Sequence, residues 1–153
     1  MTTPFLENTS LETVDSLPQF PVDALPGLYA AAYELYRNGK YVEACRIFHV
    51  LALTDPCNSR FWMGLGACYQ MQKNYPDAIK AYSAAAIQDS HNPHIHLHAA
   101  ECFYHSENLP KALIALESSL ITAKESEEHT ELLPQLELLM ETWSQKQKGI
   151  CYG

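Results

Sequence analysis

The chain has 153 residues, 47% of them hydrophobic and 18% charged, which is typical of a single globular domain with enough apolar side chains for a core. Its 10 Lys and Arg against 18 Asp and Glu give a net charge of −8. We therefore expect no nucleic-acid partner and no binding to anionic membranes, because both need a positive surface.

No apolar run approaches the roughly 20 residues of a membrane span, so we expect no direct membrane insertion. The first residues lack the basic and apolar regions of a signal peptide. Five cysteines without a CxxC pair favour buried thiols in a reducing compartment. The chain is therefore expected to be cytosolic.

Residues 1–24 mix apolar side chains with prolines. The stretch SLETVDSLPQFPVDALP predicts a short helix near 10–17 and then an extended link. Several apolar side chains lie in a segment that is too short to bury them, which predicts self-association through this segment. These side chains are Leu11, Val14, Leu17, Phe20 and Val22.

Five columns of residues then recur with a period of 34. Small residues in some columns allow two antiparallel helices to approach closely, and bulky residues in the others fill the space beside the contact. The columns are Ala32, Gly66, Ala100; Leu35, Tyr69, Phe103; Tyr41, Tyr75, Leu109; Ala44, Ala78, Ala112; and Phe48, Tyr82, Leu116. Turn residues separate the paired helices at Asn38 and Gly39, Lys73 and Asn74, and Glu107 and Asn108.

This pattern resembles the tetratricopeptide repeat, a helix–turn–helix unit of about 34 residues. The middle unit matches the repeat signature at Trp62, Leu65, Gly66, Tyr69, Ala78 and Tyr82. The outer units carry Leu28 and His96 at the tryptophan position. We predict an all-α fold of three repeats, about 25–58, 59–92 and 93–126, wound into a right-handed superhelix.

A stack of repeats leaves its last apolar face bare, so a C-terminal capping helix is expected. Residues 127–146 supply it, and residues 147–153 are predicted to be a frayed tail. The apolar face of this helix comprises Leu132, Leu133, Leu136, Leu139, Met140 and Trp143.

In tetratricopeptide repeats, one face of the first helix of each unit lines the inside of the superhelix. The resemblance places the following residues on that concave face: Pro26, Tyr29, Tyr33, Tyr36 and Arg37; Arg60, Met63, Ala67, Gln70 and Met71; His94, Leu97, Glu101, Tyr104 and His105. The helix–helix seam of the first unit is expected to hold Leu28, Ala31, Ala32 and Leu35.

Tyr29, Tyr33 and Tyr36 recur at i, i+4 and i+7, so they form one stripe on a helix. Each buried tyrosine hydroxyl needs a hydrogen-bond partner, which favours a partly hydrated wall over a dry core. Tyrosine and methionine are also common on adaptable peptide-binding surfaces. The alternative is that the stripe packs against the N-terminal segment.

Several stretches resemble one family more specifically, the class II chaperones of bacterial type III secretion. They are GLYAAAYELYRNGKYVEACRIFHVLALTD, the GLGACYQ element and HLHAAECFYHSENLPKAL. The resemblance covers about residues 20–126, which is most of the chain.

That resemblance implies a cytoplasmic bacterial chaperone without enzymatic activity or cofactor. Members of this family keep hydrophobic translocator proteins soluble and apart before export, and they bind an extended segment with proline and leucine side chains in the concave groove. The family's groove aromatics fall on Tyr29, Tyr33, Tyr36 and Tyr41, and its contacts on the second pair of helices fall on Arg60, Phe61 and Met63. Family members often form homodimers, commonly through the N-terminal segment.

Two other kinds of site are disfavoured by the residues. A clamp for a C-terminal carboxylate needs Lys, Arg and Asn where this chain has Tyr29, Tyr33, Gly64, His94 and His98. A metal site could use His94 and His98, which are i, i+4 on one helix, but no second spaced pair of ligands accompanies them. We therefore predict no metal. A generic repeat scaffold that joins two folded partners stays open as the alternative function.

Overall fold

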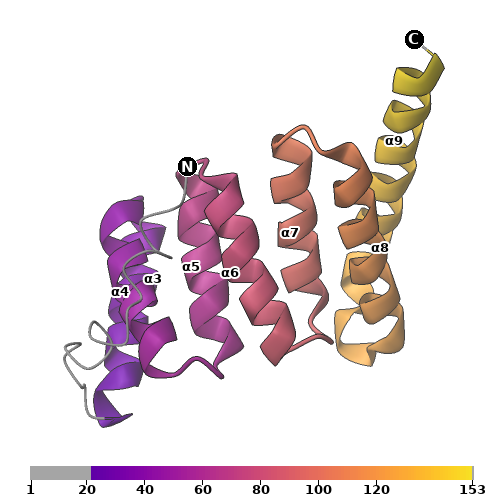
Figure 1. Cartoon of the computed structure of the whole chain (residues 1–153). Coiled ribbons are helices and arrows are strands. Elements are labelled where there is room, and N and C mark those ends of the chain that lie inside the picture. Colours follow the sequence, from indigo (N-terminus) through magenta and orange to yellow (C-terminus); the bar gives the residue numbers. More distant parts are fainter. Residues whose placement is uncertain (1–21, 153) are drawn as a thin grey trace.

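The computed structural model describes residues 22–152, and within that range it is all-α, which confirms the predicted fold class (Figure 1). Three antiparallel helix pairs follow one another along the chain. They are α3 (Leu25–Arg37) with α4 (Tyr41–Thr54), α5 (Ser59–Met71) with α6 (Tyr75–Gln88), and α7 (Pro93–His105) with α8 (Leu109–Glu125). A 3-10 turn, η1 (Val22–Ala24), precedes α3. The helix expected near residues 10–17 lies outside the described residues.

The first helices of the three pairs begin at Leu25, Ser59 and Pro93, each 34 residues after the last. Local hydrogen bonds repeat with the same spacing. The side chains of Asn58 and Asn92 accept hydrogen bonds from backbone N–H groups two residues later, which caps α5 and α7. Asn74 and Asn108 cap α6 and α8 through the N–H groups three residues later.

The turn within each pair also repeats. Gly39, Lys73 and Glu107 occupy equivalent positions and have φ values of 78°, 60° and 60°. This left-handed conformation is the usual end of a helix, and glycine adopts it without a steric penalty. The first turn therefore has glycine, the residue that this conformation favours, whereas the other two turns have Lys73 and Glu107 in the same conformation.

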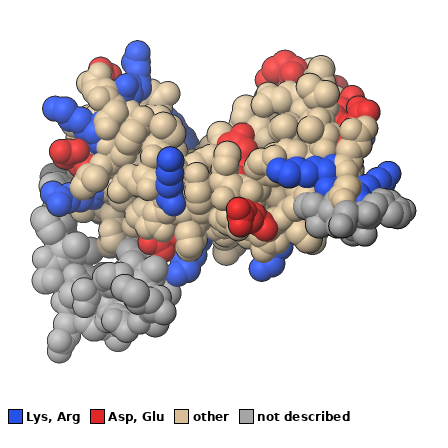
Figure 2. Space-filling model, turned by 90° about the horizontal axis from the view of Figure 1, so that it is seen from above, with Lys and Arg blue, Asp and Glu red and all other residues tan. Residues whose placement is uncertain are grey.

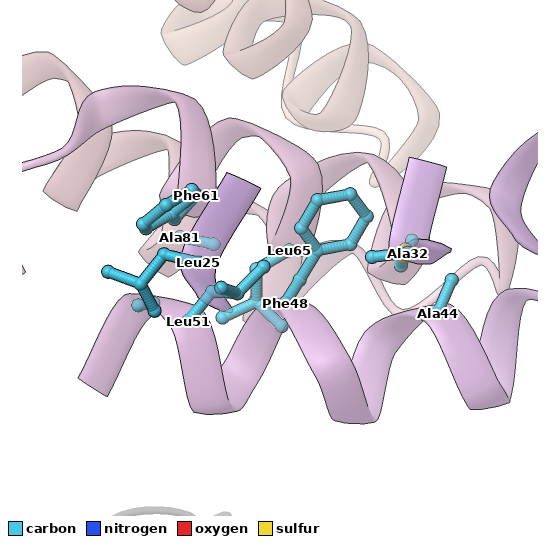
Figure 3. Packing of buried hydrophobic residues seen from close by; sticks show 10 residues of the cluster. Leu25, Ala32, Ala44, Phe48, Leu51, Phe61, Leu65 and Ala81 are labelled. Carbon is cyan, nitrogen blue, oxygen red and sulfur yellow. The ribbon is translucent and has the colours of Figure 1, made fainter. Parts of the chain in front are cut away.

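The core consists of the predicted columns. Ala32 faces Ala44 at the close contact of α3 and α4, and both are fully buried (Figure 3). Phe48 lies beside Leu65 and connects the first pair to α5 (Figure 3). In the seam of α3, Leu28 and Leu35 are partly buried as expected, but Ala31 is exposed, because the seam is centred on Ala32.

The C-terminal cap differs from its predicted bounds. Residues 127–132 form the 3-10 turn η2 (Glu127–Leu132), and α9 begins only at Leu133. The cause is a kink at His129, whose φ of −120° is not helical. The helix then continues to Tyr152, so the predicted frayed tail is wrong for residues 147–152. Leu136 and Trp143 are buried in one cluster with residues of α8.

Candidate functional site

The inner helices α3, α5 and α7 contact one another in sequence, α3 with α5 and α5 with α7. They therefore form one continuous wall. Viewed along the helices, the molecule is hollowed on one side, and uncharged side chains cover most of that hollow (Figure 2).

A pocket of about 360 Å³ opens on the inner wall, and we call it the tyrosine pocket. Its lining residues are Tyr29, Tyr33, Tyr36, Phe48, Arg60, Met63, Gly64, Ala67, Tyr82 and His98. Six of these were predicted from the sequence to face the groove: Tyr29, Tyr33, Tyr36, Arg60, Met63 and Ala67. The pocket thus spans all three inner helices.

The three tyrosines of α3 form a continuous aromatic ladder. The ring centroids of Tyr29 and Tyr33 are 6.3 Å apart and stacked, and those of Tyr33 and Tyr36 are 6.5 Å apart. Tyr33 is 49% exposed, so its ring is available to a ligand. Burial, and then the neighbouring Tyr41, raise the pKa of Tyr36. Tyr36 therefore presents a neutral hydroxyl at this wall.

Arg60 lies at the open end of the ladder, where its guanidinium carbon is 4.8 Å from the centre of the Tyr29 ring. This is the geometry of a cation–π contact. A second cavity of about 460 Å³ adjoins the pocket here, since Tyr29 and Arg60 line both. An extended ligand can therefore continue from the tyrosine pocket toward the start of α3.

The opposite side of the tyrosine pocket carries a polar network across repeats. The Tyr82 hydroxyl donates to the side-chain oxygen of Gln70 at 2.7 Å, and the Gln70 amide donates to Glu101 at 3.0 Å. His98 Nδ1 lies 3.4 Å from the same Glu101 carboxylate oxygen. Burial acts to raise the pKa of Glu101, but the hydrogen bonds from His98 and Gln70 outweigh it, so this pKa is lowered.

Other predicted groove residues lie elsewhere. Leu97 is only 4% exposed and belongs to the core. Phe61 is only 5% exposed, but its side chain lines the adjoining cavity of about 460 Å³. Tyr41 packs edge-on against Tyr36 at 5.5 Å. Met71 is exposed at the end of α5, outside the tyrosine pocket. The ring of His94 meets that of His129 at 5.3 Å.

Tyr104 of α7 is taken up by the C-terminal cap. Its ring stacks on Trp143 of α9 with centroids 4.6 Å apart, and its hydroxyl accepts a hydrogen bond from Lys146 at 2.9 Å. The predicted groove position in the third repeat is therefore packed against α9.

Gln70 and Glu101 were also predicted to face the groove. Because their side chains are hydrogen-bonded to each other, they support the wall of the pocket from within the protein.

Four residues of the tyrosine pocket were not predicted: Phe48, Gly64, Tyr82 and His98. Phe48 and Tyr82 belong to a packing column, and each reaches the pocket past an inner helix. Gly64 makes this possible for Phe48 and Gly66 does so for Tyr82, because a β-carbon at either position would overlap the ring. The absence of a side chain at position 64 was the available signal in the sequence.

Features of catalytic or metal sites are scarce. Burial raises the pKa of the Cys68 and Cys102 thiols to about 12, so neither is a ready nucleophile. Among the described residues, no group of three or more His, Cys, Asp or Glu side chains could hold a metal ion. Within the same part of the chain, no helix is both long enough and apolar enough to span a membrane.

Comparison with known proteins agrees with the repeat geometry. Tetratricopeptide repeat models match residues 29–93 and 70–136. Low calcium response locus protein H of Yersinia pestis is 40% identical over 63 residues, which are 41% of this chain and 38% of that protein. The match therefore spans well under half the length of this curated relative.

Solved structures extend the similarity over nearly the whole fold. PcrH in complex with the chaperone-binding region of PopD superposes with a TM-score of 0.81 and is 30% identical, over 84% of this chain and 96% of PcrH. The type III secretion chaperone SycD of Yersinia enterocolitica, in complex with a peptide of the translocator YopD, gives a TM-score of 0.79 and 34% identity, over 83% of this chain and 97% of SycD. The chain belongs to the family of tetratricopeptide-repeat chaperones of type III secretion.

Proposed function

We propose that this protein is a cytoplasmic chaperone that binds an extended segment of a hydrophobic translocator protein in the tyrosine pocket. It keeps the translocator soluble and apart from other components until export. The observation that carries the proposal is the exposed aromatic ladder of α3, which faces a pocket lined mainly by apolar atoms. Extended segments rich in proline and leucine suit such a wall, because rigid aromatic and flexible methionine surfaces bind them without charge.

The proposed contacts divide by helix. Tyr29, Tyr33 and Tyr36 hold the apolar side chains of the segment, and Met63 with Ala67 form the floor on α5. Arg60 borders the continuation toward the start of α3, where it can donate to carbonyl groups of the ligand. Binding and release are the whole activity in this proposal, which includes no catalysis and no cofactor.

The test is titration of the purified chain with the YopD peptide, using a control peptide whose prolines and leucines are replaced by serine. We expect saturable binding of the first peptide and none of the second. Equal binding of both, or of neither, would contradict the proposal. A generic scaffold would instead bind a folded partner and ignore the extended peptide.

We further propose that the protein forms a homodimer through residues 1–24, whose apolar side chains exceed what so short a segment can bury. An alternative dimer is described for SycD. Deletion of residues 1–21 should shift the protein toward monomer in sedimentation while the helical circular dichroism signal of residues 22–152 persists. An unchanged oligomer would place the interface elsewhere.

A further inference from the structure

Of the side chains that line the tyrosine pocket, His98 is the one imidazole, and it joins the apolar ladder to the polar network. Its ring stacks on Tyr82 with centroids 5.5 Å apart and an interplanar angle of 23°. Its side chain is 37% exposed, so a ligand in the pocket can reach it. The imidazole is therefore both fixed in orientation and accessible.

The hydrogen bond to Glu101 determines which ring nitrogen carries the proton. A carboxylate can only accept a hydrogen bond, so the Nδ1 atom that faces Glu101 must be the donor. Glu101 is in turn held by Gln70, which accepts from Tyr82. In the neutral imidazole this leaves the lone pair on Nε2, which is then a hydrogen-bond acceptor.

An extended ligand brings backbone N–H groups into the pocket, and a buried N–H without a partner weakens binding. Apart from the tyrosine hydroxyls, Nε2 of His98 is the nitrogen or oxygen acceptor among the side chains that line this pocket, since the guanidinium of Arg60 only donates. We propose that His98 is a cargo-positioning residue whose Nε2 accepts a backbone N–H of the extended translocator segment, fixing its register against the tyrosine ladder. This inference rests on the proposed function, and it assigns the recognition of backbone to α7 and of side chains to α3.

Replacement of His98 by phenylalanine keeps a flat ring against Tyr82 but removes both nitrogens. We expect the affinity for the YopD peptide to fall about five- to tenfold, as for the loss of one hydrogen bond. His98→Gln, which can place an acceptor oxygen near the Nε2 position, should recover part of that loss. His91→Phe, a matched change in the loop before α7 and outside the tyrosine pocket, should bind as wild type.

The decisive experiment uses a series of YopD peptides, each methylated at one backbone nitrogen. At one position, methylation should weaken binding to wild type about five- to tenfold and leave binding to His98→Phe unchanged within about twofold. Equal losses in both proteins at every position would overturn the role of His98 while leaving the proposed function intact. Failure of wild type to bind the unmethylated peptide would contradict both.

Nitrogen-15 spectra of the imidazoles provide a second readout that a purely structural role would not produce. His98 should carry its proton on Nδ1, and the addition of peptide should shift the Nε2 signal in the direction of an accepted hydrogen bond. His96 is the internal control, because its Nε2 lies 3.0 Å from a backbone carbonyl oxygen and must be the donor. A proton on Nε2 of His98 would contradict the inference.

Discussion

Trp62 and His96 stand 34 residues apart and make the same hydrogen bond in successive repeats. The Trp62 indole donates to the carbonyl oxygen of Pro56 at 2.7 Å, and His96 Nε2 lies 3.0 Å from the carbonyl oxygen of Ser90. Pro56 and Ser90 are themselves 34 residues apart. Successive repeats therefore both have a hydrogen-bond donor at this position, although the residue type differs.

This equivalence predicts different effects for two substitutions of His96. His96→Phe should lower the free energy of unfolding by about 1 kcal/mol, because the Ser90 carbonyl loses its donor. His96→Trp should retain the bond and most of the stability. Thermal or urea unfolding of the two variants measures the difference, and equal destabilisation by both would show that the hydrogen bond does not determine stability at this position.

Two glycines with empty surroundings should respond with opposite sign to the same substitution. Among the described residues, and apart from chain neighbours and the helix's own backbone, no atom lies within 4 Å of a β-carbon built at Gly27 or at Gly39. Gly27 lies inside α3, where alanine should stabilise by about 0.5–1 kcal/mol. Gly39 has a φ of 78°, where alanine should destabilise by about 1 kcal/mol.

Unfolding midpoints in urea for Gly27→Ala and Gly39→Ala are the measurement. Midpoints that move in the same direction would contradict the left-handed turn at residue 39.

Gly66 allows the Tyr82 ring of α6 to pack directly against the backbone of α5. A β-carbon at this position would be 2.8 Å from the Tyr82 ring, which is 1% exposed and cannot move into solvent. Gly66→Ala should therefore cost about 1–3 kcal/mol of stability through overpacking. It should also weaken peptide binding, since Tyr82 lines the tyrosine pocket and donates to Gln70. A variant as stable as wild type would contradict the packing described here.

Acidification should destabilise the fold in two stages. Burial lowers the pKa of His49, so the unfolded chain takes up a proton on this imidazole at a higher pH than the folded chain does. The fold is therefore stable with respect to this group above about pH 6.5, and it loses stability as the pH falls from there toward the lowered pKa. The pKa of Glu101 is also lowered, by its bonds to His98 and Gln70 against the effect of burial. The stability that ionised Glu101 contributes is present above the pKa of the unfolded state, about 4.3, and is lost as the pH falls through the lower pKa of the folded state.

Thermal melting between about pH 7.5 and pH 3.5 tests both stages. His49→Gln should reduce the first loss, and Glu101→Gln the second. Unchanged pH profiles in both variants would show that other groups control acid stability.

The helix pairs and the ladder were predictable because both depend on short-range periodicity. Matched sizes at Ala44, Ala78 and Ala112 specify the seam, and the spacing of Tyr29, Tyr33 and Tyr36 places them on one face. These features follow from the geometry of a single helix or of one repeat.

The errors concern contacts between distant parts of the chain. Tyr104 has the spacing of a groove residue, but α9 folds back and stacks Trp143 on it. The sequence pattern offers His98 only as a metal ligand beside His94, because its place in the pocket depends on Glu101 and on Tyr82 from the preceding repeat. The kink at His129, which delays α9, has no counterpart in the hydrophobic pattern.

We propose that Tyr33, the exposed member of the tyrosine ladder, binds cargo and contributes little to the stability of the fold. Tyr33 is half exposed on the groove wall, whereas Ala78 is fully buried in the seam of α6. Truncation of Tyr33 should thus affect binding, and enlargement of Ala78 should affect folding. Comparing the two variants in the same pair of assays separates these roles.

The most direct measurement is thermal melting together with titration of the YopD peptide, for Tyr33→Ala and Ala78→Leu side by side. Tyr33→Ala should lose about 2 kcal/mol or more of binding, roughly thirtyfold in affinity, and far less stability than the about 3–5 kcal/mol of a buried aromatic. Ala78→Leu should lose about 1–3 kcal/mol of stability and retain binding wherever it is folded. If Tyr33→Ala melts like a core variant or binds the peptide as tightly as wild type, the ladder is ordinary packing and the chaperone groove lies elsewhere.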